Sequence, residues 1–122
     1  MIIGIGVDIC QVDRVAAMLE RHPGLMDRLF NSAESHTADG RPRSADSLAA
    51  RFCAKEALAK ALGSPGGMSW LDAEVITSAN GAPEFVIRST VAARAAECAV
   101  QNIGLSLSHD GGLATAFVIC EG

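Results

Sequence analysis

Hydrophobic and polar positions along the chain follow two periods, which predict its strands and helices. Residues 1–9 form a short apolar run with the β-branched character of a buried strand. Residues 44–63 combine strong helix formers with apolar side chains on nearly all sides, which is typical of one long buried helix. Ser44 is placed to cap its start, and Gly63 to end it in a left-handed turn.

The remaining segments complete an α+β pattern. Helical periodicity is present in residues 12–22, 24–30 and 89–100. Strands are expected over residues 73–77, 84–88, 103–108 and 113–120. Asn31 and Glu34 have the spacing of a capping box for a further short turn. The order β-α-α-α-β-β-α-β-β predicts two β-α-β-β halves that form one mostly antiparallel sheet packed against the long central helix.

Four charged residues interrupt the apolar surface of the long helix. Arg51, Lys55 and Glu56 fall within or beside its bulky stripe, and Lys60 follows one turn after Glu56. Burying such charges unpaired would cost several kcal/mol each, so we expect them to line a wet cleft and to face a charged ligand. The alternative is an ordinary exposed pair of Glu56 and Lys60, worth about 0.3–0.5 kcal/mol, beside solvated basic groups.

Two other segments carry candidate binding residues. Asp8 closes the first strand, where a carboxylate is either a cap or turn residue or a ligand. Arg14, Met18 and Arg21 align on one face of the 12–22 helix. That face is either simply solvated or a docking strip for an acidic partner, whose association rim charges would accelerate.

Composition excludes several classes of function. The 122 residues have the length of a single domain, residues 1–122, and 49% of them are hydrophobic. A net charge of −4 argues against a nucleic-acid binder acting through a global basic field. The four cysteines are too scattered for a paired zinc motif and indicate free thiols in a reducing cytoplasm. No run is long enough to span a membrane.

Four sequence blocks, in this order and spacing, identify a family resemblance. They are GIGVDICQVDR at residues 4–14, LAARFCAKEALAKALG at 48–63, NGAP at 80–83 and LSLSHD at 105–110. The chain resembles the holo-acyl-carrier-protein synthase type of 4′-phosphopantetheinyl transferase over essentially its full length. That family moves the phosphopantetheine arm of coenzyme A onto a serine of an acyl carrier protein or carrier domain and releases adenosine 3′,5′-bisphosphate.

The resemblance implies a magnesium site. Asp8 and Glu56 match the family's Mg²⁺ ligands, and Mg²⁺ is usually held by one or two carboxylates plus substrate phosphates. Lys60 resembles the lysine that neutralises those phosphates, which makes these three the expected catalytic residues. Lys55 either acts on the phosphates in the same way or holds Glu56 in place. The serine nucleophile belongs to the carrier, and its proton passes to a metal-associated water or to the carboxylate pair.

The resemblance also implies the binding partners. The residues matched to coenzyme binding, apart from the two lysines, are Arg43, Arg51, Gly63, His109 and the turn against the adenine, Asn80, Gly81 and Pro83. The strip of Arg14, Met18 and Arg21 matches the helix on which the carrier docks. Members of this short form are trimers that share their sites between subunits, and they serve fatty acid or polyketide biosynthesis. The rival functions are a metal-dependent phosphohydrolase and a non-catalytic nucleotide-binding oligomer.

Overall fold

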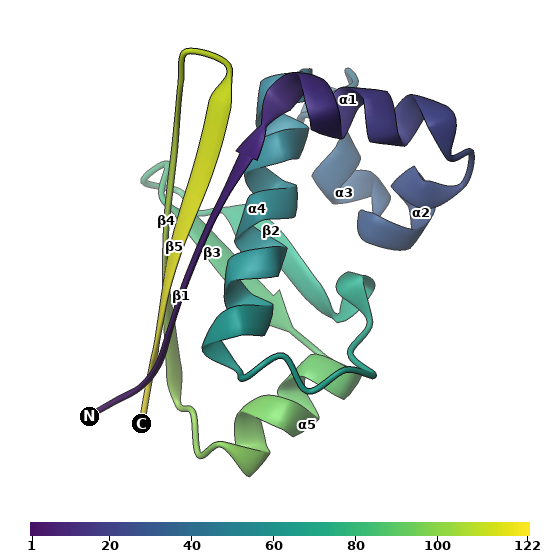
Figure 1. The fold of residues 1–122 in the computed structure, drawn as a ribbon. Helices are drawn as coiled ribbons and strands as arrows, with labels where there is room; N and C mark the ends of the chain where they lie inside the picture. The colour runs from purple at the N-terminus through teal and green to yellow at the C-terminus, as the bar shows by residue number, and fades with distance from the viewer.

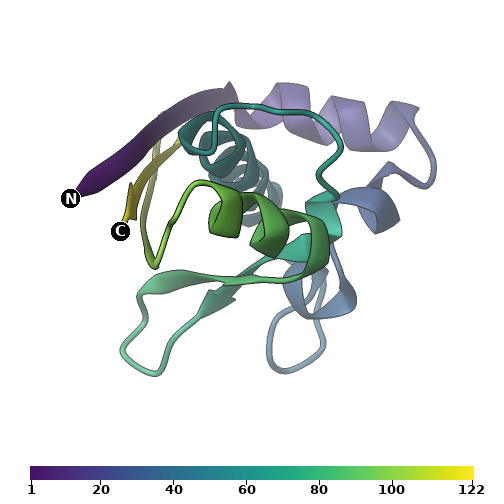
Figure 2. The same ribbon diagram turned by 90° about the horizontal axis from the view of Figure 1, so that it is seen from below.

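The long helix α4 is the element around which the other helices and strands are arranged (Figures 1 and 2). The structure is a computed structural model, and it describes residues 1–122. Its elements, in chain order, are β1 (Ile2–Gln11), α1 (Val12–Arg21), α2 (Leu25–Leu29), α3 (Ser32–Ser35), α4 (Ala45–Ala61), the 3-10 helix η1 (Trp70–Asp72), β2 (Ala73–Thr77), β3 (Pro83–Ile87), α5 (Ser89–Glu97), β4 (Asn102–Asp110) and β5 (Leu113–Glu121).

The sequence-based prediction of α4 is confirmed. Ser44 caps the helix by accepting a hydrogen bond from the Ser47 N–H, and Gly63 follows its end with φ of 86°. Residues on most sides of α4 are buried, because β1, β5, β4, β2, α1 and α3 all contact it. The main hydrophobic core lies between α4, β5, α5 and the hairpin of β2 and β3.

The GxG spacing in β1 lets α4 approach the strand closely. A Cβ atom at Gly4 would lie 2.0 Å from the Ala61 carbonyl oxygen, and one at Gly6 would lie 1.8 Å from that of Ala57. Only glycine fits at such positions. Because side chains alternate along a strand, Asp8, two residues after Gly6, points to the same face and therefore toward α4.

The α+β class and the order of elements are confirmed, but the strands form two sheets instead of one. The first has the order β1-β5-β4 and the second consists of β2 and β3, and both are antiparallel. β3 lies beside β4 without forming a ladder with it. The two are joined by side-chain packing, since Phe85 and Ile87 of β3 and Leu105 of β4 all pack against the main core.

Two predicted boundaries also differ from the structure. The last two strands were expected over residues 103–108 and 113–120, but only Gly111 and Gly112 separate them, because β4 and β5 remain paired as far as Asp110 and Leu113. Both glycines have positive φ, which a two-residue hairpin turn requires. The helix expected over residues 89–100 ends at Glu97, and Ala99 then adopts φ of 60°.

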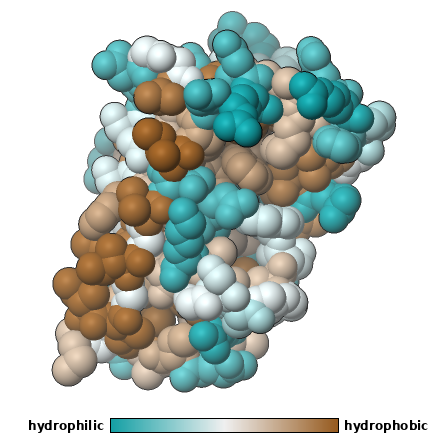
Figure 3. Space-filling view, in the orientation of Figure 1, coloured by the Kyte–Doolittle hydropathy of each residue, from teal (hydrophilic) through white to brown (hydrophobic).

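The expectation that β1 is a buried strand is correct for only one of its faces. The other face carries large hydrophobic side chains that are 39–63% exposed: Ile3, Ile5, Val7 and Ile9. Leu113 and Phe117 of β5, the neighbouring strand, are also exposed. Figure 3 shows hydrophobic surface gathered along this side of the molecule. Apolar patches of this kind on a small chain are typical of interaction surfaces. No helix has the length and apolar character needed to cross a membrane.

Candidate active site

The end of β1 and the C-terminal half of α4 bring three of the expected residues together. The Lys60 ammonium donates hydrogen bonds to Oδ1 of Asp8 at 3.1 Å and to the Val7 carbonyl at 3.0 Å. The Asp8 side chain is 19% exposed and that of Lys60 is 50% exposed. Lys60 therefore pairs with Asp8 across the strand–helix contact, and the alternative of an ordinary exposed ion pair with Glu56 does not describe it.

Glu56 is the third member of this group. The charges of both Asp8 and Lys60 act on its carboxyl group. Partial burial and the negative charge of Asp8 raise the pKa of Glu56, and the positive charge of Lys60 partly opposes this rise. Two carboxylates held together in this way repel each other. A divalent cation would relieve that repulsion, and paired carboxylates are the oxygen donors that Mg²⁺ prefers. The donor set at Asp8 and Glu56 therefore fits Mg²⁺.

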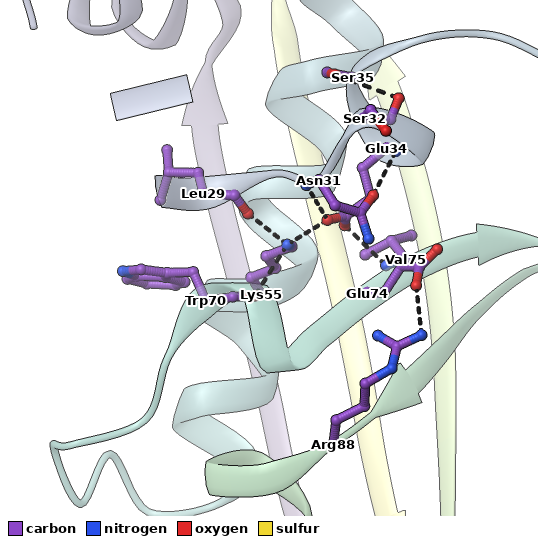
Figure 4. Close-up of polar contacts among 10 residues, drawn as sticks. All are labelled: Leu29, Asn31, Ser32, Glu34, Ser35, Lys55, Trp70, Glu74, Val75 and Arg88. Carbon is purple, nitrogen blue, oxygen red and sulfur yellow. Dashed lines mark hydrogen bonds and ion pairs between the residues drawn. The ribbon is translucent and has the colours of Figure 1, made fainter. Parts of the chain in front are cut away.

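Lys55, expected at the coenzyme phosphates or behind Glu56, is used elsewhere. Its ammonium donates to the Leu29 and Trp70 carbonyls and to Oε1 of Glu34, as Figure 4 shows. An ammonium has three donors, and these contacts use all of them. The side chains of Lys55 and Glu34 are 1% and 0% exposed. These contacts leave no donor of Lys55 free for a phosphate and favour a structural role, and its assignment to coenzyme binding stays a prediction.

Glu34 is the buried ion-pair partner of Lys55, and only one of its contacts could be predicted from the sequence. The capping box with Asn31 is present, as predicted. The same carboxylate also accepts the Lys55 ammonium and, through Oε2, the Val75 N–H of β2. This buried pair thereby joins α2, α3, α4, η1 and β2. The long-range partners could not be found from local spacing, because they come from residues 21 and 41 positions away.

A second polar cavity lies against the N-terminal half of α4. It has a volume of about 390 Å³ and is lined by polar and charged residues with few hydrophobic ones: Ser44, Asp46, Ser47, Ala50, Arg51, Thr77, Gly81, Pro83, Leu107 and His109. Four of the residues matched to coenzyme binding thus meet here: Arg51, Gly81, Pro83 and His109. Ser47 and Thr77, which the sequence analysis did not identify, accept hydrogen bonds from the Arg51 guanidinium.

Arg51 is the most informative residue of this cavity. It is only 7% exposed, and its Nε has no hydrogen-bond partner. Burial, and to a lesser extent the nearby charge of Arg43, lower its pKa. Buried polar groups are normally paired, so an unpaired guanidinium donor indicates an anion site.

The remaining residues matched to coenzyme binding lie close to this cavity or have local roles. Arg43 lines an adjacent cavity with His36 and Glu74, and its Nε is also buried without a partner. Asn80 stabilises its turn by accepting a hydrogen bond from the Ala82 N–H. Gly63 provides the left-handed residue after α4. For Asn80 and Gly63, as for the residues that line the two cavities, contact with coenzyme A stays a prediction.

The helix face predicted for docking borders a groove. Arg14, Met18 and Arg21 lie along a cavity of about 780 Å³ with Cys10, Phe52 and Leu113 from β1, α4 and β5. The basic groups thus flank an apolar floor, which is the arrangement expected of a protein-docking surface. The apolar floor could not be predicted from local sequence, because its residues come from three separate elements.

A further cavity, of about 290 Å³, adjoins Glu56. Besides Glu56, its lining includes Lys55, Leu58 and Ala59 of α4, Val91 of α5, Trp70 of η1, and Gly66, Gly67, Met68 and Ser69 of the loop between α4 and η1. The lining is half apolar. The loop that follows α4, with glycines at positions 66 and 67, thus forms a wall beside Glu56.

The chain matches a known family over nearly its whole length. The family model of the 4′-phosphopantetheinyl transferase superfamily matches residues 4–118. A holo-[acyl-carrier-protein] synthase from Streptomyces avermitilis is 55% identical over 99% of this chain and 98% of its own length. The synthase from Clavibacter sepedonicus is 56% identical over 100% of this chain and 98% of its own length.

Solved structures agree with this match. The holo-[acyl-carrier-protein] synthase of Neisseria meningitidis superimposes with a TM-score of 0.88 and 30% identity, covering 100% of both chains. That of Helicobacter pylori, solved in complex with coenzyme A, gives a TM-score of 0.82 and 28% identity over 96% of this chain and 99% of the other. The chain is therefore a transferase of the 4′-phosphopantetheinyl transferase superfamily. Within it, the chain belongs to the family of holo-[acyl-carrier-protein] synthases.

Proposed function

We propose that the domain formed by residues 1–122 transfers the 4′-phosphopantetheine group from coenzyme A to a serine of an apo acyl carrier protein or carrier domain. The reaction is Mg²⁺-dependent and releases adenosine 3′,5′-bisphosphate. The observation that carries this proposal is the meeting of Asp8, Glu56 and Lys60 at the contact of β1 with α4. The relatives, which are synthases of this type, support the choice of substrates.

The chain's own residues have distinct roles in this reaction. Asp8 and Glu56 hold the cation, and Lys60 neutralises the pyrophosphate. Mg²⁺, when bound, supplies charge stabilisation across the two phosphates. The serine oxygen forms a bond to the β-phosphorus. The bond from the β-phosphorus to the oxygen that bridges it to the α-phosphorus breaks, and adenosine 3′,5′-bisphosphate leaves with that oxygen. The serine proton passes to a metal-associated water or to the carboxylate pair, the acceptor that this chain itself offers.

The coenzyme is bound mainly through its charged end. Arg51, Arg43 and His109 contact its phosphates, and Gly81 and Pro83, in the turn with Asn80, contact the adenine. The buried, unpaired guanidinium nitrogens of Arg51 and Arg43 support this assignment. The pantetheine arm occupies the half-apolar cavity beside Glu56, whose volume of about 290 Å³ admits a chain of that kind.

We further propose a homotrimer in which each site combines residues of two neighbouring subunits. Arg51 and Glu56 are five positions apart on α4 and so point about 140° away from each other. They line different cavities, Glu56 the one beside the loop after α4 and Arg51 the polar one at the N-terminal half of α4. A neighbouring subunit, packed on the exposed apolar face of β1 and β5, would bring its own Arg51 cavity toward this chain's carboxylate pair.

The carrier docks in the groove bordered by Arg14, Met18 and Arg21. Carriers of this kind are acidic, so the two arginines provide the complementary charge and Met18 an adaptable apolar contact. This proposal assigns the reaction to fatty acid or polyketide biosynthesis. The four free cysteines fit a cytoplasmic location.

Intact-mass measurement tests the transfer. The chain is incubated with coenzyme A, Mg²⁺ and a panel of apo carriers, and at least one carrier should gain the mass of phosphopantetheine. A metal-dependent phosphohydrolase would release the bisphosphate without any carrier. A non-catalytic nucleotide-binding oligomer would bind coenzyme A and leave every carrier unchanged, and either result would reject the proposal.

A further inference from the structure

Two cysteine thiols lie beside Asp8 and have no place in the proposed reaction. A carboxylate oxygen of Asp8 and the sulfurs of Cys10 and Cys53 all lie within 4.8 Å of one another. The Cys53 thiol donates to Oδ2 of Asp8 at 3.5 Å and to the Ala114 carbonyl at 3.4 Å. The Lys60 ammonium occupies the other oxygen, Oδ1. Asp8 is therefore shared between a basic group on one side and two sulfurs on the other.

The topology explains why these three residues meet. Asp8 and Cys10 are two residues apart on β1, so both side chains point toward α4. Cys53 is fully buried on the facing side of α4, and the thiol of Cys10 donates to the Ala49 carbonyl one turn earlier. Cys10 is half-buried and also lines the docking groove, which gives the cluster a path to solvent.

We propose that Asp8, Cys10 and Cys53 form a binding site for a thiophilic divalent cation such as Zn²⁺ or Cd²⁺. Two sulfurs and one carboxylate oxygen are a ligand set that such ions accept, with a fourth position left for water. Tetrahedral ligands of Zn²⁺ lie about 3.5–4 Å from one another, so the three ligand atoms, which lie within 4.8 Å, must draw closer together to bind the ion. Binding displaces both thiol protons to solvent. Mg²⁺, which requires oxygen ligands, gains nothing from the sulfurs.

Occupancy of this site would inhibit the transferase, a consequence that rests on the proposed function. Asp8 belongs to both ligand sets, so an ion held by the two sulfurs removes Asp8 from the pair with Glu56. Zinc inhibition should therefore depend on the thiols, although neither thiol takes part in the transfer.

Titration with Cd²⁺ alone tests the binding site. Wild-type chain should develop one equivalent of ultraviolet Cd–thiolate absorption. Cys10→Ala and Cys53→Ala should each weaken binding at least about tenfold, and Cys98→Ala, at a half-buried thiol outside the cluster, should not. No thiolate band in the wild type, or the same band in both variants, would overturn the proposal. Cys10→Ala, at the less buried position, keeps the test available if Cys53→Ala does not fold.

Inhibition is measured separately, at saturating Mg²⁺, relative to each variant's own zinc-free rate. The Zn²⁺ concentration for half-inhibition should rise at least about tenfold in Cys10→Ala and stay unchanged in Cys98→Ala. Equal sensitivity of both variants would overturn the link through Asp8. The Cd²⁺ titration needs no turnover, so it judges the metal site even if the transferase proposal fails.

Discussion

The Lys60 ammonium lies 3.1 Å from Oδ1 of Asp8, and this contact joins the end of β1 to the last turns of α4. The two residues are 52 positions apart in the chain. They meet because Gly4 and Gly6 allow α4 to lie directly on the strand. The position of the proposed catalytic group is thus set by backbone packing between these two elements.

Removing either carboxylate should nearly abolish transfer. Asp8→Asn and Glu56→Gln each remove one charged oxygen donor from the proposed Mg²⁺ site. We expect the transfer rate to fall at least about a hundredfold, as when one stabilising group is lost from a polar active site. Intact-mass kinetics with an apo carrier provide the measurement. Near-normal rates in both variants would show that the two carboxylates do not hold the metal.

The same Glu56→Gln variant should not be less stable at neutral pH. The pKa of Glu56 is raised in the folded chain, so the folded state binds this proton more tightly than the unfolded state does. Ionised Glu56 therefore disfavours folding above its raised pKa, and this cost is relieved as the pH falls through it. Gln carries no charge and removes the cost. Tm measured at pH 7 should be equal to or above that of the wild type, and a clear decrease would contradict the assigned cause.

Titration of Glu56 should respond to its two charged neighbours in opposite directions. Asp8→Asn removes a negative charge and should lower the pKa of Glu56, whereas Lys60→Met removes a positive charge and should raise it further. Carbon-detected NMR of the side-chain carboxyl measures both shifts without a metal. Shifts in the same direction in both variants would rule out this arrangement.

Breaking the buried pair should destabilise the whole fold. Lys55→Met leaves the Glu34 carboxylate charged and buried, which typically costs about 3–5 kcal/mol. The matched control is Arg41→Met in the exposed pair with Asp39, where the loss should stay below about 1 kcal/mol. Urea unfolding measures both. Adding Glu34→Gln to Lys55→Met should cost less than the sum of the single losses, and strict additivity would argue against a direct coupling.

A methyl group on the glycine face of β1 should separate the strand from α4. In Gly6→Ala the added Cβ would lie 1.8 Å from the Ala57 carbonyl oxygen, so the strand or the helix must move. We expect a loss of about 1–3 kcal/mol in the free energy of unfolding and a large loss of transfer, because Asp8 moves with the strand. Gly104→Ala is the control, since its nearest atom is 3.9 Å away. Similar losses in the two variants would contradict the close strand–helix contact.

Charge reversal in the docking groove should affect one substrate more than the other. The double variant Arg14→Glu and Arg21→Glu places negative charge beside an acidic carrier, so the KM for the carrier should rise at least about tenfold while that for coenzyme A changes little. Steady-state kinetics with each substrate varied in turn provide the test. Equal increases in both KM values would place these arginines outside the carrier interface.

Local sequence was sufficient for most of the fold. The 3.6-residue and two-residue periods, with Ser44, Gly63 and the capping box of Asn31 and Glu34, correctly predicted the elements and the α+β class. These signals act between residues a few positions apart, so they need no tertiary context. The division of the strands into two sheets escaped prediction, because β3 meets β4 through side chains and not through a backbone ladder.

The sequence by itself determined which chemical groups the chain carries, because residue type and helical spacing identify carboxylates, basic groups and apolar faces. Only the tertiary structure decided which of them meet. Adjacent residues Lys55 and Glu56 illustrate the difference: one is buried against Glu34, and the other lies beside Asp8. The side chains of consecutive residues on a helix point about 100° apart, so they face different surroundings. The partner of each side chain is then set by the distant segment that packs against that side of the helix.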